Sequence, residues 1–514
     1  MEKFSNMEYL DFSDPTVLKK QQEAIEYVKQ QMGKEYPNYI NGEEYFTDKK
    51  TKSYNPGNKE ELVGIFQKAG REGAEKAIQA ADHAFQTWKN VPAEERAQYL
   101  FKAAAICKRR RYEINAWMIT EAGKSYLEAD ADTCEAIDFL DFYGREAIRY
   151  SERQPVTEMP GEDNHYFYIP LGVGICIPPW NFPFAIMTGI TTAAIAAGNT
   201  VVLKPSSDTP MMAFLIVDIL NQIGLPKGVL NFLVASGSEA GDYMVDHPRT
   251  RFISFTGSME VGKRINERAA KVNEGQLWLK RVVAEMGGKD AIIVDSEADL
   301  ESAADGVVAS AFGFQGQKCS ACSRAIVDEK IYDKFMDMIA ERTNNIKIGD
   351  PRENFKMGPV INEAAYNDIL KYIEIGKEEG TIIAGGEADA NKNGWYIKPT
   401  IVKDVDRNAR LAQEEIFGPV LTVIKAKDFD DALEVANGTI YGLTGAIYSQ
   451  NISKLERARK EFHVGNLYMN RKCTGAYVDV QPFGGFNMSG TDSKAGSRDY
   501  LALFMQGKSV TTKF

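Results

Sequence analysis

Apolar residues recur at helical spacing through the early part of the chain. A period of 3.6 residues places one apolar face of a helix against a core. The residues that recur with this period are Ala77, Ile78, Ala81, Ala84, Phe85 and Trp88. The same kind of pattern continues through RAQYLFKAAAICKRRR and CEAIDFLDFYGREAIRY. We therefore expect packing helices from about residue 72 to residue 149.

From residue 173 to residue 294, short apolar runs alternate with helical segments such as MMAFLIVDILNQI. The runs are VGICIPP, NTVVLKP, GVLNFLVA, RFISFTG and RVVAEM. This alternation indicates βαβ units and a parallel sheet, which binds ligands at the carboxyl ends of its strands. After Gly287 and Gly288 a second series begins with DAIIV and SRAIVD and continues to about Val464. The pattern predicts an α/β fold with two lobes that meet near residue 287 and enclose a cleft.

The segment QPVTEMPGEDNHYFYIPLGV combines Pro and Gly with an alternating run of Tyr and Phe. This pattern predicts a β-hairpin that leaves the body of the domain. The C-terminal GKSVTTKF is also typical of a strand. Because such arms commonly meet a partner subunit, we expect both segments to pair across subunits.

Composition narrows the class of protein. A chain of 514 residues exceeds what one hydrophobic core usually serves. The net charge of -11 disfavours nucleic-acid binding, which needs a basic patch. The start MEKFSNMEYLDFSD has no apolar signal region, and the most apolar run, AIMTGITTAAIAAGNTVVL, is interrupted by Gly, Thr and Asn. We expect a cytoplasmic protein without a membrane span.

Cysteine and histidine are sparse. The six cysteines form no dense disulfide framework, and none of the four histidines has ligand spacing, so no metal site is expected. Cys319 and Cys322 form a C-x-x-C, which is compatible with a redox pair, half of a zinc site, two buried thiols or one nucleophile. The Gly-rich approach GFQGQK leaves backbone amides free around Cys319 and favours the last interpretation.

Two further polar residues stand where the predicted strands end. Glu285 precedes two glycines in VVAEMGGKD, where a carboxylate can activate water; the alternative is a surface glutamate. Asn181 lies between prolines and aromatics in IPPWNFPFAI, where an amide suits an oxyanion hole; the alternative is a turn asparagine.

The segment RFISFTGSMEVGKRI is the best candidate for nucleotide binding. A strand ends at Gly257, and Ser258 is a natural N-cap of a helix whose first N–H groups can bind a pyrophosphate. The segment is also a near miss to a P-loop, because Arg264 stands where Ser or Thr is required. Lys204, at the end of TVVLKP, has the reach for a ribose or phosphate, although most such lysines are simply solvated.

Seven stretches occur together and in order: PWNFPF, LKPSSDTP, FTGSMEVGKRI, AEMGGKDA, GQKCSAC, EEIFGPVL and PFGGFNMSG. In the identity and order of these seven motifs, the chain resembles the aldehyde dehydrogenase superfamily. The stretches GQKCSACSR and RKCTGAYVDVQPFGGFNMSG most resemble its 1-pyrroline-5-carboxylate (L-glutamate γ-semialdehyde) dehydrogenases. The resemblance implies two Rossmann-type α/β lobes with a cleft and a β-hairpin oligomerisation arm. It also implies NAD(P)-dependent oxidation of L-glutamate 5-semialdehyde to L-glutamate, as in proline and arginine catabolism. Another semialdehyde dehydrogenase, or a P-loop-like nucleotide-binding protein, is the alternative.

The resemblance assigns catalytic roles. Cys319 would attack the aldehyde as a thiolate, its oxyanion would be held by the Asn181 amide and the Cys319 N–H, and Glu285 would activate water to hydrolyse the thioester. A lowered thiol pKa is required, for which Lys318 and the free amides are candidate sources.

It also assigns binding residues. For NAD these are Pro179, Trp180, Lys204, Ser207, Gly257, Ser258, Glu415 and Phe417. Ser207 stands where many relatives carry a glutamate, so NADP use stays open. The residues assigned to the substrate carboxylate are Ser320, Gly475 and Ala476, and Phe184 and Phe483 are assigned to the carbon chain of the substrate.

The implied domains are a dinucleotide-binding domain (1–150 and 171–286), a catalytic domain (287–478) and bridging segments (151–170 and 490–514). The implied partners are a small-molecule substrate and further copies of the chain, as a homodimer or larger homo-oligomer. No nucleic acid and no membrane are expected.

Overall fold

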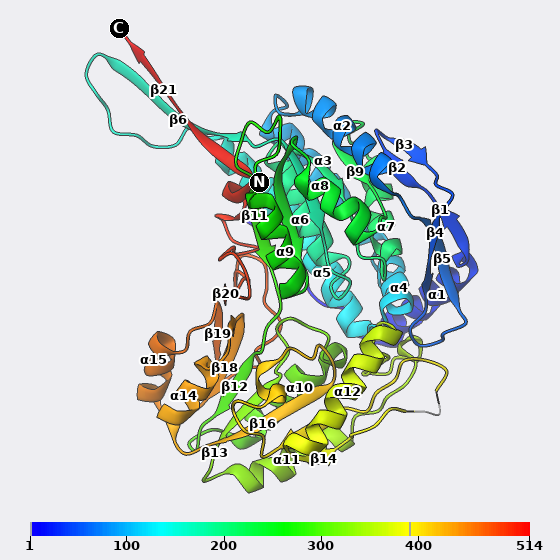
Figure 1. The fold of residues 1–514 in the computed structure, drawn as a ribbon, viewed down its shortest axis with the longest axis vertical. Coiled ribbons are helices and arrows are strands. Elements are labelled where there is room, and N and C mark those ends of the chain that lie inside the picture. Colours follow the sequence, from blue (N-terminus) through cyan, green and yellow to red (C-terminus); the bar gives the residue numbers. More distant parts are fainter. Residues whose placement is uncertain (1–2, 390–391) are drawn as a thin grey trace.

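The computed structural model describes residues 3–389 and 392–514. Two α/β bodies lie one above the other, and a thin two-stranded ribbon projects from the upper one (Figure 1). The upper body contains a seven-stranded sheet in the order β11-β10-β7-β8-β9-β2-β3. Its strands are β2 (Asn38–Ile40), β3 (Glu43–Tyr45), β7 (Val173–Ile177), β8 (Thr200–Leu203), β9 (Leu230–Phe232), β10 (Thr250–Thr256) and β11 (Arg281–Glu285). The five strands β7 to β11 are parallel, and their positions confirm the strand runs predicted in this region.

Helices cover both faces of this sheet. Alternate residues of a strand point to opposite faces. Ile175 and Val202 pack with α2 (Arg71–Trp88), whereas Cys176 and Val201 pack with α5 (Tyr126–Ser151) and α6 (Ala185–Ala196). The predicted helical region is four helices, α2 (Arg71–Trp88), α3 (Ala93–Arg109), α4 (Arg111–Ala122) and α5 (Tyr126–Ser151). The other helices of this body are α1 (Pro15–Gln31), α6 (Ala185–Ala196), α7 (Pro210–Gln222), α8 (Asp242–Asp246) and α9 (Met259–Ala270).

The lower body is built on a second seven-stranded sheet, in the order β14-β15-β16-β13-β12-β18-β19. Its strands are β12 (Ala291–Val294), β13 (Arg324–Asp328), β14 (Thr381–Ala384), β15 (Thr400–Lys403), β16 (Val420–Ala426), β18 (Thr444–Tyr448) and β19 (Asn466–Met469). The strands β12 and β13 are buried along their whole length, which explains why they are continuous apolar runs in the sequence. The helices are α10 (Leu300–Phe312), α11 (Tyr332–Asn344), α12 (Glu363–Glu379), α13 (Arg410–Gln413), α14 (Phe429–Asn437) and α15 (Ile452–Glu461).

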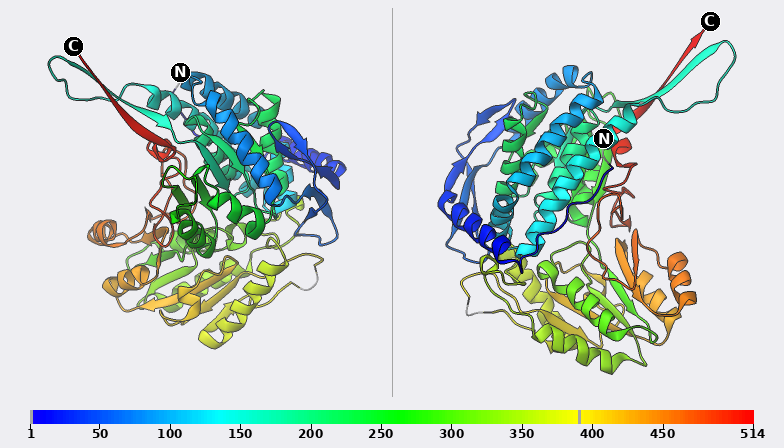
Figure 2. Two further views of the ribbon diagram at one scale, coloured as in Figure 1. Left: turned by 45° about the horizontal axis from the view of Figure 1, so that its top comes forward. Right: turned by 180° about the vertical axis from the view of Figure 1, so that it is seen from behind.

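The projecting ribbon differs from the predicted hairpin. It consists of β6 (Glu162–Pro170) and the C-terminal β21 (Met505–Lys513), paired antiparallel over nine residues each and extending well beyond the body (Figure 2). The residues before β6 contribute only the bridge between Gln154 and Tyr166. The tail therefore pairs with β6 of its own chain, which corrects the expectation of a local hairpin within residues 151–170.

Some elements carry no clear signal in the sequence. A small sheet is formed by β1 (Lys34–Tyr36), β4 (Lys50–Tyr54) and β5 (Leu62–Gln67), whose strands are short and partly exposed. The first residues run as an extended segment along the helices of the upper body, as the right-hand view of Figure 2 shows. Within the described residues, no helix is long and apolar enough to cross a membrane.

Candidate active site

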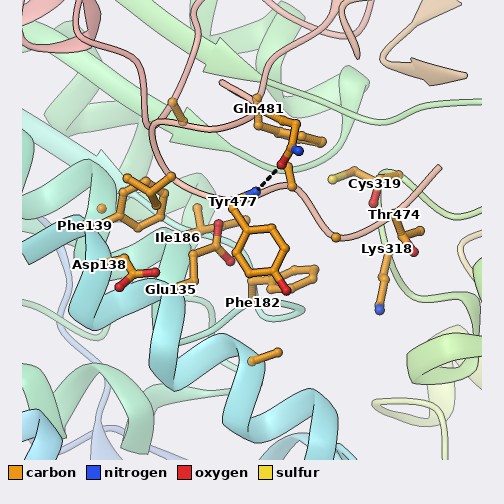
Figure 3. Close-up of a pocket in the computed structure, with 18 of the residues that line it drawn as sticks. Glu135, Asp138, Phe139, Phe182, Ile186, Lys318, Cys319, Thr474, Tyr477 and Gln481 are labelled. Atoms are coloured by element: carbon orange, nitrogen blue, oxygen red, sulfur yellow. Dashed lines mark hydrogen bonds between the residues drawn. The ribbon is translucent and has the colours of Figure 1, made fainter. Parts of the chain in front are cut away.

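A cavity of about 370 Å³ contains many of the residues that the sequence singled out. Its walls come from α5, from the turn after β7, from the end of β11 and from the loop that follows β19. Of the predicted site residues, it is lined by Glu285, Cys319, Ser320, Gly475, Ala476 and Phe483. Figure 3 shows Cys319 across this cavity from the side chains of α5. Residues nearly 200 positions apart in sequence therefore meet around one thiol.

The backbone before Cys319 is held in an unusual conformation. Phe314 and Gln315 have φ angles of 48° and 57°, in the left-handed region that costs energy for residues with a Cβ. The Gln315 side chain stabilises this bend, because Nε2 donates to the carbonyls of Gly123 at 3.1 Å and Pro359 at 2.7 Å. The bend turns the chain out of α10 and brings Cys319 to the cavity.

Two glycines allow the lobes to meet at this point. A Cβ on Gly287 would lie 2.1 Å from Glu415 Oε2, and a Cβ on Gly288 would lie 2.6 Å from the carbonyl oxygen of Cys319. Neither approach leaves room for a side chain. The Gly-Gly pair is therefore required by the close approach of Glu415 to Gly287 and of the nucleophile loop to Gly288.

The electrostatics of Cys319 differ from the expectation. Burial raises the pKa of the Cys319 thiol, and the carboxylates of Asp290, Glu415 and Glu285 raise it further. Lys318 does not oppose this effect, because its Nζ lies 2.7 Å from the Glu128 carboxylate, with which it forms an ion pair. Lys318 is thus not the source of a lowered thiol pKa, and a base must accept the thiol proton.

Cys322 is separated from this chemistry. It is 1% exposed, its N–H donates to Ser310 O at 3.1 Å, and its thiol donates to Arg324 O at 3.4 Å. It packs in the core of the lower body and does not line the cavity. The C-x-x-C spacing therefore places one thiol in the site and one in the core.

Glu285 ends β11 inside the cavity and is only 8% exposed, so it is not a surface glutamate. Burial raises the pKa of its carboxyl to about 8. Its carboxylate accepts hydrogen bonds from the Ser493 hydroxyl and, at 3.3 Å, from the Gly485 N–H. A carboxylate with a pKa near the working pH is suited to general-base catalysis.

Asn181 lies against the nucleophile loop. It is 3% exposed, and its Nδ2 donates to the carbonyl of Gln317 at 3.1 Å, two residues before Cys319. This bond fixes the amide and uses one of its two N–H groups. Among the described residues, the Cys319 N–H has no hydrogen-bond partner. The second N–H of the Asn181 amide and the Cys319 N–H thus have no partner among the described residues, although Asn181 does not line the cavity.

The loop after β19 has the features of an anion-binding turn. Gly475 has a φ of 80°, and Arg471 Nη2 donates to the carbonyls of Thr474 at 3.1 Å and Gly475 at 2.6 Å. In the part of the chain that the structure describes, the N–H groups of Gly475 and Ala476 have no partner. Successive free N–H groups of this kind bind carboxylates.

One predicted aromatic position is wrong by two residues. Phe184 is fully buried, at the start of α6, and packs in the core of the upper body. Phe182 lines the cavity in its place, as Figure 3 shows. Phe483 lines the cavity as expected, so the two aromatic walls are Phe182 and Phe483.

The sequence analysis missed the acidic face of α5. Glu135 and Asp138 line the cavity, and Figure 3 shows both on α5, away from Cys319. Burial raises the pKa of Glu135 to about 8, and the neighbouring Asp132 adds to this effect. The sequence does contain a signal for this face, because acidic residues stand within an otherwise buried helix. A buried carboxylate without a partner in its own chain needs a positive partner, which a ligand can supply.

The predicted cofactor residues Lys204, Ser207 and Ser258 follow the carboxyl ends of the parallel strands β8 and β10. Lys204 is 8% exposed, and burial lowers its pKa to about 8. The only hydrogen bond that its Nζ makes in the described chain is to Pro205 O at 3.4 Å, so this buried cation has no carboxylate partner. Ser258 caps α9 by accepting from the Val261 N–H, and Ser207 is exposed. A buried cation and a free helix N-terminus fit the hydroxyl and phosphate groups of a dinucleotide.

Glu415 and Phe417, two further predicted cofactor residues, lie beside the nucleophile loop. Glu415 Oε1 accepts from the Gly288 N–H at 3.0 Å, and burial raises the pKa of its carboxyl to about 7. The Phe417 ring meets Trp180 edge-on, with centroids 5.4 Å apart. Pro179 and Trp180 are half-buried at the end of β7.

Known proteins resemble this chain over nearly its whole length. The profile of the family described as "Aldehyde dehydrogenase family" matches residues 45–510. The 1-pyrroline-5-carboxylate dehydrogenase of Geobacillus thermodenitrificans is 60% identical over 492 residues, which are 96% of this chain and 95% of that protein. The structure of 1-pyrroline-5-carboxylate dehydrogenase from Thermus with bound NAD has a TM-score of 0.99 and 49% identity over 100% of both chains. Betaine aldehyde dehydrogenase from Staphylococcus aureus, in complex with NAD+, has a TM-score of 0.89 and 30% identity, covering 96% of this chain and 97% of its own.

Proposed function

The chain belongs to the aldehyde dehydrogenase family, and from this premise we propose that it oxidises L-glutamate 5-semialdehyde to L-glutamate with NAD. This is the reaction of the 1-pyrroline-5-carboxylate dehydrogenases that it matches over nearly its whole length. The observation that carries the proposal is the cavity itself, because a nucleophile and an anion-binding turn both line it.

The two ends fit an amino-acid aldehyde. The aldehyde carbon meets Cys319, while the free N–H groups of Gly475 and Ala476 and the hydroxyl of Ser320 receive the α-carboxylate. The carboxyl group of Glu135 on α5 offers a hydrogen-bond acceptor for the α-ammonium group. Because a simple aliphatic aldehyde leaves these buried polar groups unpaired, the site discriminates against it.

The reaction follows from the positions of three side chains. A base removes the Cys319 proton, the sulfur bonds to the aldehyde carbon, and the resulting oxyanion accepts hydrogen bonds from the Asn181 amide and the Cys319 N–H. When bound, NAD supplies the acceptor for the hydride. The loss of this hydride from the substrate carbon leaves an acyl thioester on Cys319. Glu285 then takes a proton from water, the hydroxide attacks the thioester, and the C–S bond breaks to release the carboxylate and the thiol.

The cofactor would be held by residues of both lobes. We assign Lys204 to the adenosine ribose and Gly257 with Ser258 to the pyrophosphate, with Ser207 beside the 2′-hydroxyl. Glu415 and Phe417 would hold the nicotinamide riboside, with Pro179 and Trp180 on the same wall. On this assignment residues 1–150 and 171–286 are the dinucleotide-binding domain, and residues 287–478 are the catalytic domain.

We further assign the projecting ribbon to subunit pairing. In the part of the chain that the structure describes, β6 and β21 form a two-stranded sheet whose outer edges are unpaired except for the bridge between Gln154 and Tyr166. Such edges pair readily with another chain. Residues 151–170 and 490–514 would therefore bridge copies of this chain in a homodimer or larger homo-oligomer, which sedimentation of the native chain and of a chain ending at residue 504 would test.

The test of the activity is NADH production with a panel of aldehydes. We expect the highest kcat/KM with 1-pyrroline-5-carboxylate, lower values with succinic semialdehyde, and the lowest with an aliphatic aldehyde. The variant Cys319→Ala measures background reduction of NAD. Equal efficiency with all three substrates would contradict the proposed substrate.

A further inference from the structure

The extended N-terminal segment is fixed to α5 by carboxylates. Asp138 Oδ1 accepts from the Met7 N–H at 2.8 Å, and Asp130 Oδ2 accepts from the Leu10 N–H at 2.8 Å. Arg111 Nη2 donates to Glu8 O at 2.8 Å. Because Asp130 and Asp138 are themselves buried, the path of this segment is determined on both sides of residue 9.

The same segment reaches the loop after β19. Asn6 Nδ2 donates to Asp138 Oδ2 at 3.1 Å and to Val478 O at 3.0 Å, so one amide joins α5 to the loop. The rings of Tyr9 and Tyr477 are stacked, with centroids 5.8 Å apart and planes inclined by 21°. Both rings line the substrate cavity. The N-terminal segment therefore spans the gap between the two walls that hold the head group.

Each ring has a fixed support and a defined place. Tyr477 follows the anion-binding turn directly, and its N–H donates to Gln481 Oε1 at 3.0 Å (Figure 3). Tyr9 is 40% exposed, so its outer side faces solvent while its inner side closes the cavity. Burial raises the pKa of Tyr9, and its contact with Tyr477 adds to this effect, so the Tyr9 ring is uncharged.

We propose that the Tyr9–Tyr477 stack is the end wall of the substrate cavity and sets the longest aldehyde that the chain accepts. The proposal rests on the proposed function, since the turn at Gly475 and Ala476 must hold the head group of the substrate. With the aldehyde at Cys319 and the head group at this turn, one additional methylene drives the head group into the two rings. The Tyr9 ring cannot withdraw, because the backbone on either side of it is held by Asp130 and Asp138.

The experiment compares the five-carbon L-glutamate 5-semialdehyde with its six-carbon homologue, 2-aminoadipate 6-semialdehyde. We compare kcat/KM for the six-carbon aldehyde with kcat/KM for the five-carbon aldehyde. For Tyr9→Ala and for Tyr477→Ala we expect this ratio to rise about tenfold, which is the lower bound of the discrimination that an apolar pocket achieves for one methylene. The double variant should show little additional change, because either truncation alone opens the wall.

Two controls separate the wall from general effects. Tyr9→Phe keeps the ring and should keep the native ratio, and so should Tyr27→Ala, which removes a tyrosine that is 49% exposed on α1. Thermal unfolding of each variant shows whether it is folded. An unchanged ratio in folded Tyr9→Ala and Tyr477→Ala would overturn the proposal.

Failure of the proposed function gives a different result. In that case the native chain does not oxidise the five-carbon substrate at all. The wall is then tested with aliphatic aldehydes of increasing length, for which both alanine variants should still shift the preference toward longer chains. An unchanged length preference in these variants would reject the wall independently.

Discussion

The hydroxyl of Ser493 donates a hydrogen bond to Oε1 of Glu285, the carboxylate to which we assign the activation of water. This bond stabilises the ionised carboxylate and thus opposes burial, which raises the pKa of Glu285 to about 8. Ser493 is itself 3% exposed, so the bond is shielded from solvent. Ser493 is therefore a positioning residue that adjusts the pKa of the base.

Replacing Ser493 with alanine should shift the pH profile of turnover. Loss of the hydrogen bond raises the pKa of Glu285 above its native value of about 8. Because the base acts only when ionised, activity is lost as the pH falls through this pKa, and a higher pKa moves the loss to higher pH. We expect a shift of about one pH unit in kcat measured from pH 6 to 10.

The matched control is Ser493→Thr, which keeps a hydroxyl and should keep the native profile. A profile for Ser493→Ala that coincides with the native one would show that Ser493 has only a structural role.

Removing the base should separate hydride transfer from hydrolysis. In Glu285→Gln the thiol still attacks, but no carboxylate activates water, so the thioester persists on Cys319. Loss of a general base typically slows its step by about 10²- to 10⁴-fold. We expect one rapid equivalent of NADH followed by slow turnover, and an acyl adduct visible by intact-protein mass spectrometry. Normal turnover without an adduct would remove Glu285 from the mechanism.

The two cysteines of the C-x-x-C should differ sharply. Cys319→Ala removes the nucleophile and should abolish turnover, whereas Cys322→Ala only shortens a core side chain that is 1% exposed. A small cavity of this kind lowers stability by about 1 kcal/mol, and most activity should remain. Steady-state NADH formation and thermal unfolding measure the two effects. Equal loss of activity in both variants would restore the interpretation as a redox pair.

The sequence predicts those features that depend on local pattern. Strands buried on both faces, such as β12 and β13, are continuous apolar runs and are visible without the structure. Cys319 and Glu285 are visible because glycine-rich turns accompany them, and the structure explains one such turn through the close approach of Glu415 to Gly287.

Features set by long-range contacts could not be predicted. Lys318 stands next to the thiol in sequence, but its charge is paired with Glu128, 190 residues away. Phe184 and Phe182 are equivalent in the sequence pattern, and only the packing of α6 decides that Phe184 enters the core. The partner of β6 is likewise the distant C-terminal strand, so a local hairpin was the natural but wrong expectation.

A buried ion pair behind the cavity should matter for stability. Lys124 and Asp132 are both 0% exposed and lie 2.8 Å apart, and the Lys124 ammonium lies 4.0 Å from the ring centroid of Phe182. In Lys124→Met the Asp132 carboxylate stays buried without its partner, which should cost about 3 kcal/mol. Urea unfolding followed by tryptophan fluorescence measures the loss.

Two comparisons test this explanation. Adding Asp132→Asn to Lys124→Met removes the unpaired charge and should recover part of the stability. Lys371→Met breaks a pair whose side chains are 72% and 64% exposed, and it should leave the unfolding midpoint unchanged. A double variant no more stable than Lys124→Met would show that the loss does not come from the buried charge.

Ser207 should determine how strongly the chain distinguishes NAD from NADP. It is exposed at the end of β8, three residues after Lys204, and a serine does not repel the 2′-phosphate of NADP. In Ser207→Glu a carboxylate faces that phosphate, and like charges in contact cost several kcal/mol. We therefore expect the NADP-to-NAD ratio of kcat/KM to fall at least about tenfold. In Ser207→Gln the side chain has the same size without the charge, so the NADP-to-NAD ratio should fall much less. An equal fall of this ratio in both variants would assign the effect to size instead of repulsion.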